Sequence, residues 1–180
     1  MCAVSTSTII EEIALTRLGD TFNQYRDGER AGLLRERLGA YLLQREGADV
    51  LLVGEAAGYR GARVSGLPFT SERQLTGTGP AEATATIVHR VLADLDLGER
   101  VLLWNLVRTH PHQPGRPLSN RPPARAEIEL GRHFVSELAA GRRVLPVGRL
   151  AERALGGPSL RHPSHGGAAA FEVGLRHCLT

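Results

Sequence analysis

Residues 50–72 read VLLVGEAAGYRGARVSGLPFTSE, an apolar run that passes directly into a long polar loop. The run at 50–53 is typical of a buried strand. The loop that follows holds four glycines, which let a backbone approach a ligand closely or adopt a positive φ. Because open α/β sheets bind their ligands at loops that leave the carboxyl ends of strands, we expect this loop to form the floor of an active site.

The rest of the chain alternates between short apolar runs and amphipathic segments. Apolar runs predict strands at 50–53, 101–104, 143–147 and 159–162. Helical spacing predicts helices at 5–18, 31–44, 80–95, 125–140, 150–155 and 168–179. This alternation indicates an α/β fold, a three-layer αβα sandwich with a central four-stranded parallel sheet in a single domain. Within residues 1–180, we expect N-terminal helices over 1–48 and the α/β core over 49–180.

The composition is that of an ordinary globular protein. Of 180 residues, 42% are hydrophobic and 23% are charged. No apolar run approaches membrane length and the N-terminus lacks a signal-peptide pattern, so we expect a cytoplasmic protein with no membrane partner. Cys2 and Cys178 lie near opposite ends of the chain, which indicates neither a metal site nor a disulfide framework.

Three irregular segments each follow a predicted strand, at 54–79, 105–123 and 161–167. Because parallel strands end at the same edge of a sheet, these segments are expected to converge on one composite site. The second segment is long and rich in proline, which prevents a regular element there. Loops of this length in a compact domain are usually functional.

Five side chains in these segments could carry chemistry. Glu55 or Glu72 could act as a general base, although Glu72 equally suits a solvated loop or a helix N-terminus. Phe69 is either a core residue or a stacking platform for a base, a contact worth about 1–3 kcal/mol. Asn105 offers a donor and an acceptor for the amide edge of a pyrimidine, or bonds its own turn. His162, at a strand end before a helix, could donate to a developing anion, or it is structural.

The basic side chains are all arginine, 22 in number, and the formal net charge is +3. A coding bias explains most of this usage, but arginine also suits bidentate contacts with phosphate. The second irregular segment and its exit carry Arg108, His110, His112, Arg116, Arg121 and Arg125. They form either a phosphate-binding ridge or a solvated charged loop. No carboxylate or cysteine stands near the two histidines, so no metal site is expected.

Together these motifs resemble the uracil-DNA glycosylase superfamily from about residue 50 to the C-terminus. GEAAG at 54–58 is similar to the GEAPG of its iron–sulfur-containing thermostable branch. GARVSGLPFT at 61–70 resembles both that branch and its broad-specificity sister. Further matches, in the same order, are NLVR at 105–108, SNRPP at 119–123, VGRLA at 147–151 and HPS at 162–164. Each motif alone is weak, and their order and spacing make the set specific.

The chain departs from that branch in two respects, and it also lacks a feature of a relative of the branch. The branch binds its cluster through four cysteines, but Thr109 and Gly131 stand where two of them fall, and no CxxC precedes the first strand. We therefore expect no cluster and no other cofactor. Ala57 replaces the usual proline. A cross-linking relative relies on an inserted basic loop, whereas residues 74–79 are not basic, so that activity is not expected.

The resemblance implies a monofunctional glycosylase that hydrolyses the N-glycosidic bond of uracil, or another deaminated base, flipped out of DNA. The product would be an abasic site. In this interpretation His162 stabilises the leaving base, and Glu55 or Glu72 positions the water. The base pocket would comprise Glu55, Ala56, Gly58, Tyr59, Phe69, Asn105 and His162. Contacts with the DNA backbone would come from Arg60, Arg63, Arg108, Arg121, Ser164, His165 and Gly166.

Two alternatives remain open. One is a non-catalytic nucleotide- or nucleic-acid-binding module on the same fold. The other is a glycosylase that prefers hypoxanthine or xanthine, since the Asn105 amide can rotate. A Rossmann dinucleotide enzyme is disfavoured because no GxGxxG motif follows the first strand. We expect a monomer whose partner is DNA carrying the deaminated base.

Overall fold

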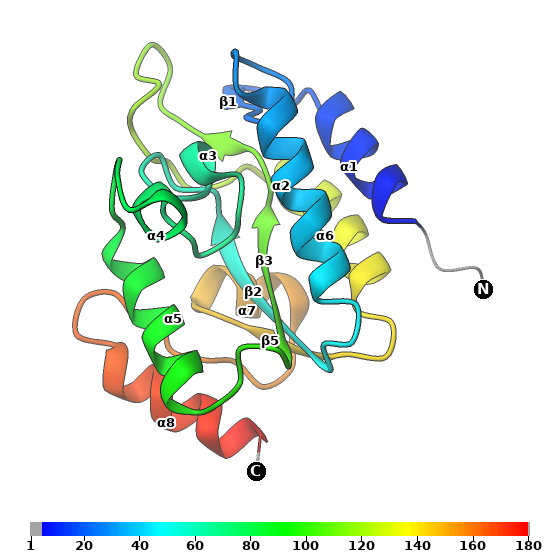
Figure 1. Ribbon diagram of the computed structural model, residues 1–180. Coiled ribbons are helices and arrows are strands. Elements are labelled where there is room, and N and C mark those ends of the chain that lie inside the picture. Colours follow the sequence, from blue (N-terminus) through cyan, green and yellow to red (C-terminus); the bar gives the residue numbers. More distant parts are fainter. Residues whose placement is uncertain (1–4, 180) are drawn as a thin grey trace.

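The computed structural model describes residues 5–179, and a three-stranded parallel sheet lies at its centre (Figure 1). The strands are β2 (Val50–Ala56), β3 (Val101–Val107) and β5 (Arg143–Pro146), in the order β3-β2-β5. The register aligns Val50 of β2 with Val101 of β3, and Gly54 with Asn105. The two longer strands are almost entirely buried, which requires cover on both faces of the sheet.

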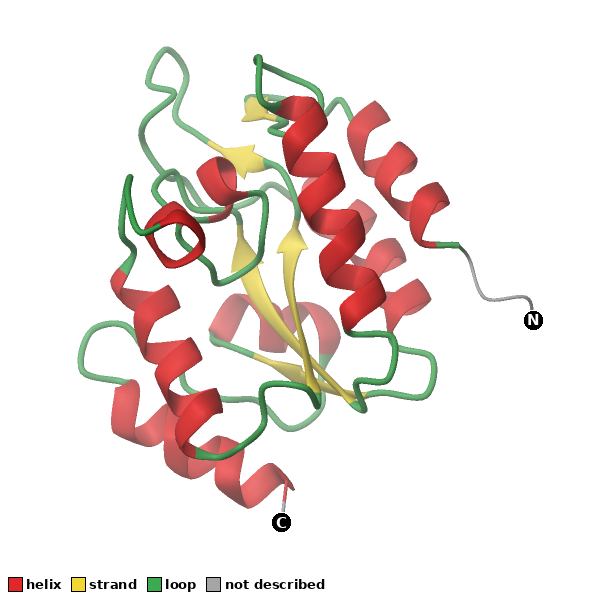
Figure 2. Cartoon of the chain, viewed as in Figure 1, coloured by secondary structure: helices red, strands yellow, loops and turns green. Residues whose placement is uncertain are grey.

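Helices supply that cover on both faces (Figure 2). One layer consists of α1 (Thr6–Leu15), α2 (Ala31–Gln44), α6 (Arg125–Leu138) and α7 (Arg149–Leu155). The other layer consists of α5 (Ala83–Asp94) and α8 (Ala168–Leu179). Because strand side chains alternate between faces, Leu51 and Val53 pack in the first layer, and Val50 and Leu52 pack in the second. The chain therefore forms a mixed α/β domain, as expected.

The prediction of a fourth strand at 159–162 is not confirmed. Only Leu160 pairs there, as a single parallel bridge to Val147 next to β5. Its N–H donates to the Pro146 carbonyl (2.8 Å), and its own carbonyl accepts from the Gly148 N–H (2.9 Å). Glycines and a proline precede this residue and Pro163 follows it, so the extended segment is too short for more than one pair. The parallel sheet of the described residues therefore has three strands.

The irregular segments contain short elements that the apolar pattern does not predict. The first holds α3 (Ala62–Ser65) and α4 (Glu72–Thr76). The second contributes β4 (His110–Pro111), which pairs antiparallel with β1 (Thr21–Phe22) from the N-terminal part of the chain. Both β2 and β3 also continue three residues beyond their expected ends at 53 and 104. These elements surround the carboxyl ends of the strands.

Two features of the described residues bear on the expectations from composition. No helix within residues 5–179 has the length and apolar character needed to cross a membrane. Cys178 is a buried free thiol in α8, whereas Cys2 lies outside the described residues.

Candidate active site

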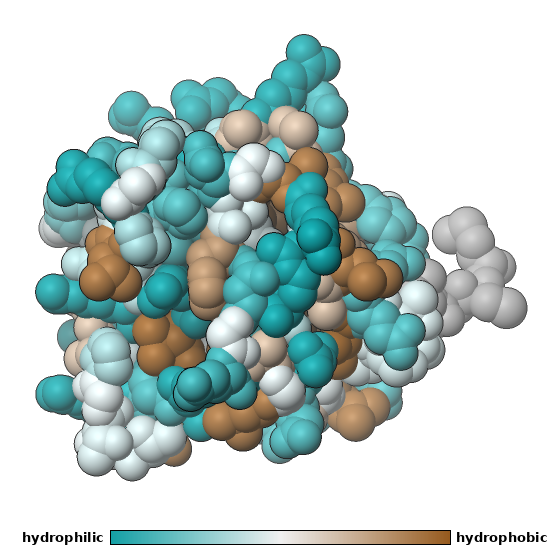
Figure 3. All heavy atoms as spheres, turned by 90° about the horizontal axis from the view of Figure 1, so that it is seen from above, coloured by the Kyte–Doolittle hydropathy of each residue, from teal (hydrophilic) through white to brown (hydrophobic). Residues whose placement is uncertain are grey.

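A pocket opens where β2 and β3 end, at the edge on which the three irregular segments converge. Its volume is about 90 Å³. The surrounding face, seen from above in Figure 3, is largely hydrophilic with separate apolar patches. The residues that line the pocket are Glu55, Ala56, Gly58, Ala62, Phe69, Glu82, Thr84, Asn105 and His162. Sequence reasoning named six of these nine residues; Ala62, Glu82 and Thr84 were missed.

Asn105 enters the pocket from the end of β3. It lies beside Gly54 in the register and is only 4% exposed. Within the described residues its side-chain amide makes no hydrogen bond, although a buried amide normally has partners. Both its donor and its acceptor are therefore free to meet a ligand in the pocket.

Phe69 forms one wall of the pocket and is held in an unusual backbone conformation. Its φ is +49°, in the left-handed region that non-glycine residues rarely adopt. The turn is fixed by Ser65, whose hydroxyl donates to the Thr70 carbonyl (2.6 Å) and accepts from the Leu67 N–H (3.1 Å). The ring lies against Gly54, where a Cβ atom would come within 2.3 Å of the Phe69 Cζ. Gly54 thus leaves room for an aromatic face directly beside Asn105.

His162 faces the pocket in a defined tautomer. The Ser164 N–H donates to its Nδ1 (3.2 Å), and the Ser164 hydroxyl lies 2.7 Å from the same nitrogen. Because Nδ1 accepts, the neutral ring carries its proton on Nε2. Burial lowers the pKa of His162, and the charges of Arg161 and His165 lower it further. The ring is therefore a neutral donor at physiological pH.

The backbone of the GEAAG segment is held on two sides. The Ala57 N–H donates to the Val107 carbonyl of β3 (3.2 Å). The Ala57 carbonyl accepts from Nδ1 of His110 (2.8 Å), which is completely buried. Burial lowers the pKa of His110, so the neutral ring donates from Nδ1. His110 is therefore a support for the pocket wall and does not belong to an exposed phosphate-binding ridge.

Glu55 and Glu82 are the carboxylates that line the pocket. Burial raises the pKa of Glu55, and the charge of Arg153 partly offsets the increase. Burial alone raises the pKa of Glu82. Glu82 immediately precedes α5, and its position in the sequence suggests only a helix N-terminus. It lies more than ten residues beyond the recognisable motif, which gives no signal that the chain folds back onto it.

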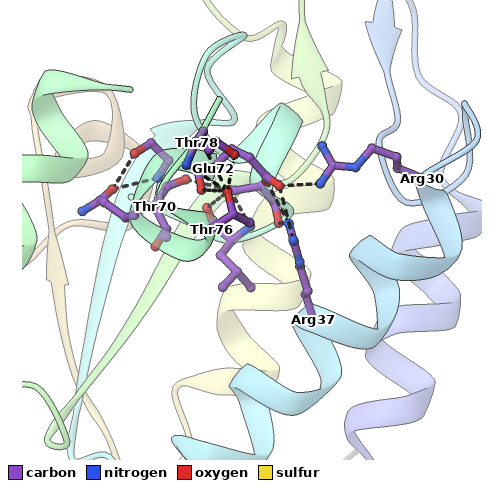
Figure 4. Close-up of polar contacts among 10 residues, drawn as sticks. Arg30, Arg37, Thr70, Glu72, Thr76 and Thr78 are labelled. Carbon is purple, nitrogen blue, oxygen red and sulfur yellow. Dashed lines mark hydrogen bonds and ion pairs between the residues drawn. The ribbon is translucent and has the colours of Figure 1, made fainter. Parts of the chain in front are cut away.

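Glu72 does not line the pocket. Figure 4 shows its contacts with Arg30 and Arg37. Its carboxylate accepts from Arg30 (2.7 Å) and from Arg37 (2.8 Å), both in the N-terminal part of the chain. Burial raises the pKa of Glu72, but the hydrogen bonds and charges of Arg37 and Arg30 outweigh it and lower the pKa overall. A carboxylate held by two guanidinium groups is a weak base, which argues against Glu72 as the group that positions water.

Two arginines expected at the DNA backbone are engaged inside the protein. Arg108 is 3% exposed, lies 4.1 Å from the Trp104 ring centre, and donates to the Tyr25 hydroxyl. Arg121 forms an ion pair with Glu127 (2.6 Å) at the start of α6. Both guanidinium groups are engaged by protein partners, which argues against DNA contacts by Arg108 and Arg121.

The other residues expected at DNA lie at the surface near the pocket. Arg60 is exposed and stacks on Tyr59 (5.3 Å), and half-buried Arg63 stacks on Phe22 (4.5 Å). Tyr59 does not line the pocket. The turn after His162 consists of half-buried Ser164 followed by the exposed residues His165 and Gly166, both with positive φ.

The residues at the expected cluster positions do not fit an iron–sulfur cluster. Thr109 and Gly131 supply no thiolate. A Cβ atom at Gly131 would lie 2.1 Å from the Leu106 carbonyl oxygen, so α6 packs on β3 too closely for a cysteine side chain. In the described part of the chain, no group of three or more His, Cys, Asp or Glu side chains could hold a metal ion.

Comparison with known proteins shows the family to which the chain belongs. The family model described as the Uracil DNA glycosylase superfamily matches residues 42–173, and the chain belongs to this superfamily. Its members are DNA glycosylases, hydrolases of base excision repair. The crystal structure of wild-type SMUG2 from Pedobacter heparinus shares the fold, with a TM-score of 0.70 and 12% sequence identity over 96% of this chain and 94% of that chain. No curated protein matches the sequence.

Proposed function

We propose that this protein is a monofunctional DNA glycosylase that removes uracil, or another deaminated base, and leaves an abasic site. The observation that carries the proposal is the meeting of Phe69, Asn105 and His162 in one pocket. These side chains provide an aromatic face, an amide with free donor and acceptor, and a neutral imidazole with a proton on Nε2. A flipped pyrimidine presents matching features: a π-face, an amide edge and a carbonyl that becomes negatively charged.

In the proposed reaction, the base leaves the DNA stack and enters the pocket, which costs a few kcal/mol and is easiest for a mispaired base. Phe69 stacks on the ring and Asn105 bonds its amide edge. As the C1′–N bond breaks, the electron pair moves into the base. His162 donates from Nε2 to the carbonyl oxygen on which this charge develops, in the manner of an oxyanion hole.

DNA outside the pocket is contacted by exposed and half-buried groups at the surface near the pocket. Arg60 and Arg63 are the candidates for backbone contacts that position the duplex without reading sequence. The turn at 164–166 supplies the backbone N–H groups of His165 and Gly166 to a phosphate near the flipped nucleotide, while Ser164 holds His162. Because the Asn105 amide has no hydrogen-bond partner within residues 5–179, it can rotate to either edge, which also favours a second candidate activity, the removal of hypoxanthine or xanthine.

An excision assay tests the proposal directly. Single- and double-stranded oligonucleotides that carry uracil, hypoxanthine or xanthine are incubated with the protein, and abasic sites are cleaved with alkali and counted. We expect His162→Ala to reduce the excision rate about 10²- to 10³-fold. Asn105→Ala should cause a similar loss, and both variants should retain DNA affinity.

The matched control is His177→Ala, at an exposed histidine of α8 outside the pocket, which should excise at the wild-type rate. Wild-type protein that binds DNA but releases no base would instead favour a non-catalytic binding module.

A further inference from the structure

Strand geometry separates the two carboxylates of the pocket. Side chains of β2 alternate between the faces of the sheet, so Glu55 points to the same side as Leu51 and Val53. This is the side of α7, and Arg153 of α7 is the charged group that acts on Glu55. Phe69 packs on the opposite face with Val50 and Leu52. Glu55 therefore reaches the pocket from the face of β2 opposite to the one on which Phe69 packs.

Glu82 approaches from the same face as Phe69 and Asn105. It is the N-cap residue of α5, and α5 packs on the Val50 and Leu52 side of the sheet. Asn105 shares this face, because it alternates with the neighbouring β3 residues Trp104 and Leu106 of the other layer. One carboxylate therefore lies on the side of the pocket where the aromatic and amide groups would hold a base.

The carboxylate of Glu82 is set directly against the glycine-rich loop. A Cβ atom at Gly61 would lie 2.0 Å from its Oε2, and a Cβ atom at Gly58 would lie 3.0 Å from its Oε1. Both oxygens thus occupy space that the two glycines leave open. A side chain at position 61 would displace the carboxylate from the pocket.

The same carboxylate has no partner among the described residues. No N–H or O–H group within residues 5–179 donates to its oxygens, and it forms no ion pair. Glu72, which lies in the same loop region, has two arginines. Burial of a carboxylate without a cation is unfavourable and is typical of catalytic groups. The raised pKa of Glu82 agrees with this interpretation.

We propose that Glu82 is the general base that orients the attacking water, an assignment that rests on the proposed glycosylase function. The water oxygen forms a bond to C1′ of the deoxyribose as the C1′–N bond breaks. One proton of the water passes to the Glu82 carboxylate. The electron pair of the broken bond leaves on the base, which His162 stabilises until solvent protonates it. Glu55 contributes chiefly its backbone to the pocket.

The test compares the isosteric variants Glu82→Gln and Glu55→Gln with the control Glu36→Gln, which alters an exposed carboxylate of α2. Single-turnover excision is measured from a uracil-containing duplex between pH 4.5 and 8.5, and DNA affinity by fluorescence anisotropy. General-base catalysis contributes about 10²- to 10⁴-fold, so Glu82→Gln should slow excision by that factor with unchanged DNA affinity. Glu55→Gln should cause a smaller loss, and Glu36→Gln none.

The pH profile separates a base from a merely structural residue. Glu55 and His162 are the other titratable side chains that line the pocket beside Glu82. Wild-type excision should fall at low pH as Glu82 protonates, and Glu82→Gln should lose that limb of the profile while His162 still titrates. Partial activity of Glu82→Asp would support the role of the carboxylate.

Normal excision by Glu82→Gln, or a larger loss in Glu55→Gln, would overturn the assignment while the glycosylase function stood. A wild-type protein inactive on every deaminated base would overturn both.

Discussion

Replacing Gly54 with alanine should displace the Phe69 ring from its stacking position without contacting a polar group of the site. The new Cβ atom would lie 2.3 Å from the Phe69 Cζ and 2.8 Å from its Cε2, whereas ordinary contact begins at 3.4 Å. The ring must therefore move by about 1.1 Å. Its backbone already has a φ of +49°, and Ser65 fixes the turn, so the displacement falls on the side chain.

The expected magnitude follows from the stacking contact. Loss of base–aromatic stacking costs about 1–3 kcal/mol, which corresponds to a decrease of roughly 5- to 150-fold in kcat/KM. Overpacking should also reduce the free energy of unfolding by about 1–3 kcal/mol. Excision kinetics and urea denaturation measure the two effects separately.

The matched control is Gly32→Ala in α2, where a Cβ atom meets no atom within 4 Å. This variant should excise normally and gain about 0.5–1 kcal/mol of stability, because alanine favours a helix over glycine. If Gly54→Ala retained wild-type kcat/KM, the Phe69 ring would not be the stacking surface.

Two further predictions concern stability. Glu72→Gln should lower the free energy of unfolding by about 1–3 kcal/mol in urea melts at pH 7. This is less than the roughly 3–5 kcal/mol lost when a fully buried ion pair is broken, because Arg30 is partly exposed and solvent screens its charge. Since the folded pKa of Glu72 is lowered, this difference should be full above about pH 4.5 and vanish as pH falls through the folded value; a constant difference down to pH 2 would contradict the ion-pair account. Because the folded pKa of His110 is also lowered, the unfolded chain binds the extra proton, so stability should fall as pH drops below about 6.5. His110→Asn should flatten that part of the thermal-melt profile, and an unchanged slope would place the proton uptake elsewhere.

The frame of the site could be predicted from the sequence because it depends on local signals. Apolar runs located β2, β3 and β5, and parallel strands bring the loops after them to one edge whatever the details of the loops. Phe69 lies in the first loop and Asn105 lies near the end of β3, so their convergence needs only the topology. His162 reaches the same edge through the single parallel pair of Leu160 with Val147. The single pair at Leu160 shows the limit: an apolar run does not reveal how many of its residues find partners.

The supporting contacts depend on tertiary paths that no local pattern reports. Arg108 follows a strand and has the appearance of a surface cation, yet it is covered by Tyr25 and Trp104. Glu72 stands two residues from the Phe-Thr pair of the motif, but it is paired with Arg30 and Arg37 and does not line the pocket. Glu82 shows the reverse case: it lies far from the motif in the sequence, but the chain folds back and places its carboxylate against the glycine-rich loop.

The pairing of β1 with β4 gives the N-terminal region a share in the site. Thr21 and Phe22 align with Pro111 and His110, and His110 in turn holds the Ala57 carbonyl. Nearby, the Tyr25 hydroxyl donates to the Gly66 carbonyl (2.6 Å). All of these N-terminal residues precede the segment that matches the family model, which begins at residue 42. The first two loops of the pocket are therefore joined through residues that lie outside the matched segment, by β1 at His110 and by Tyr25 at Gly66, so a substitution at Phe22 or Tyr25 would act on the pocket without changing any motif residue.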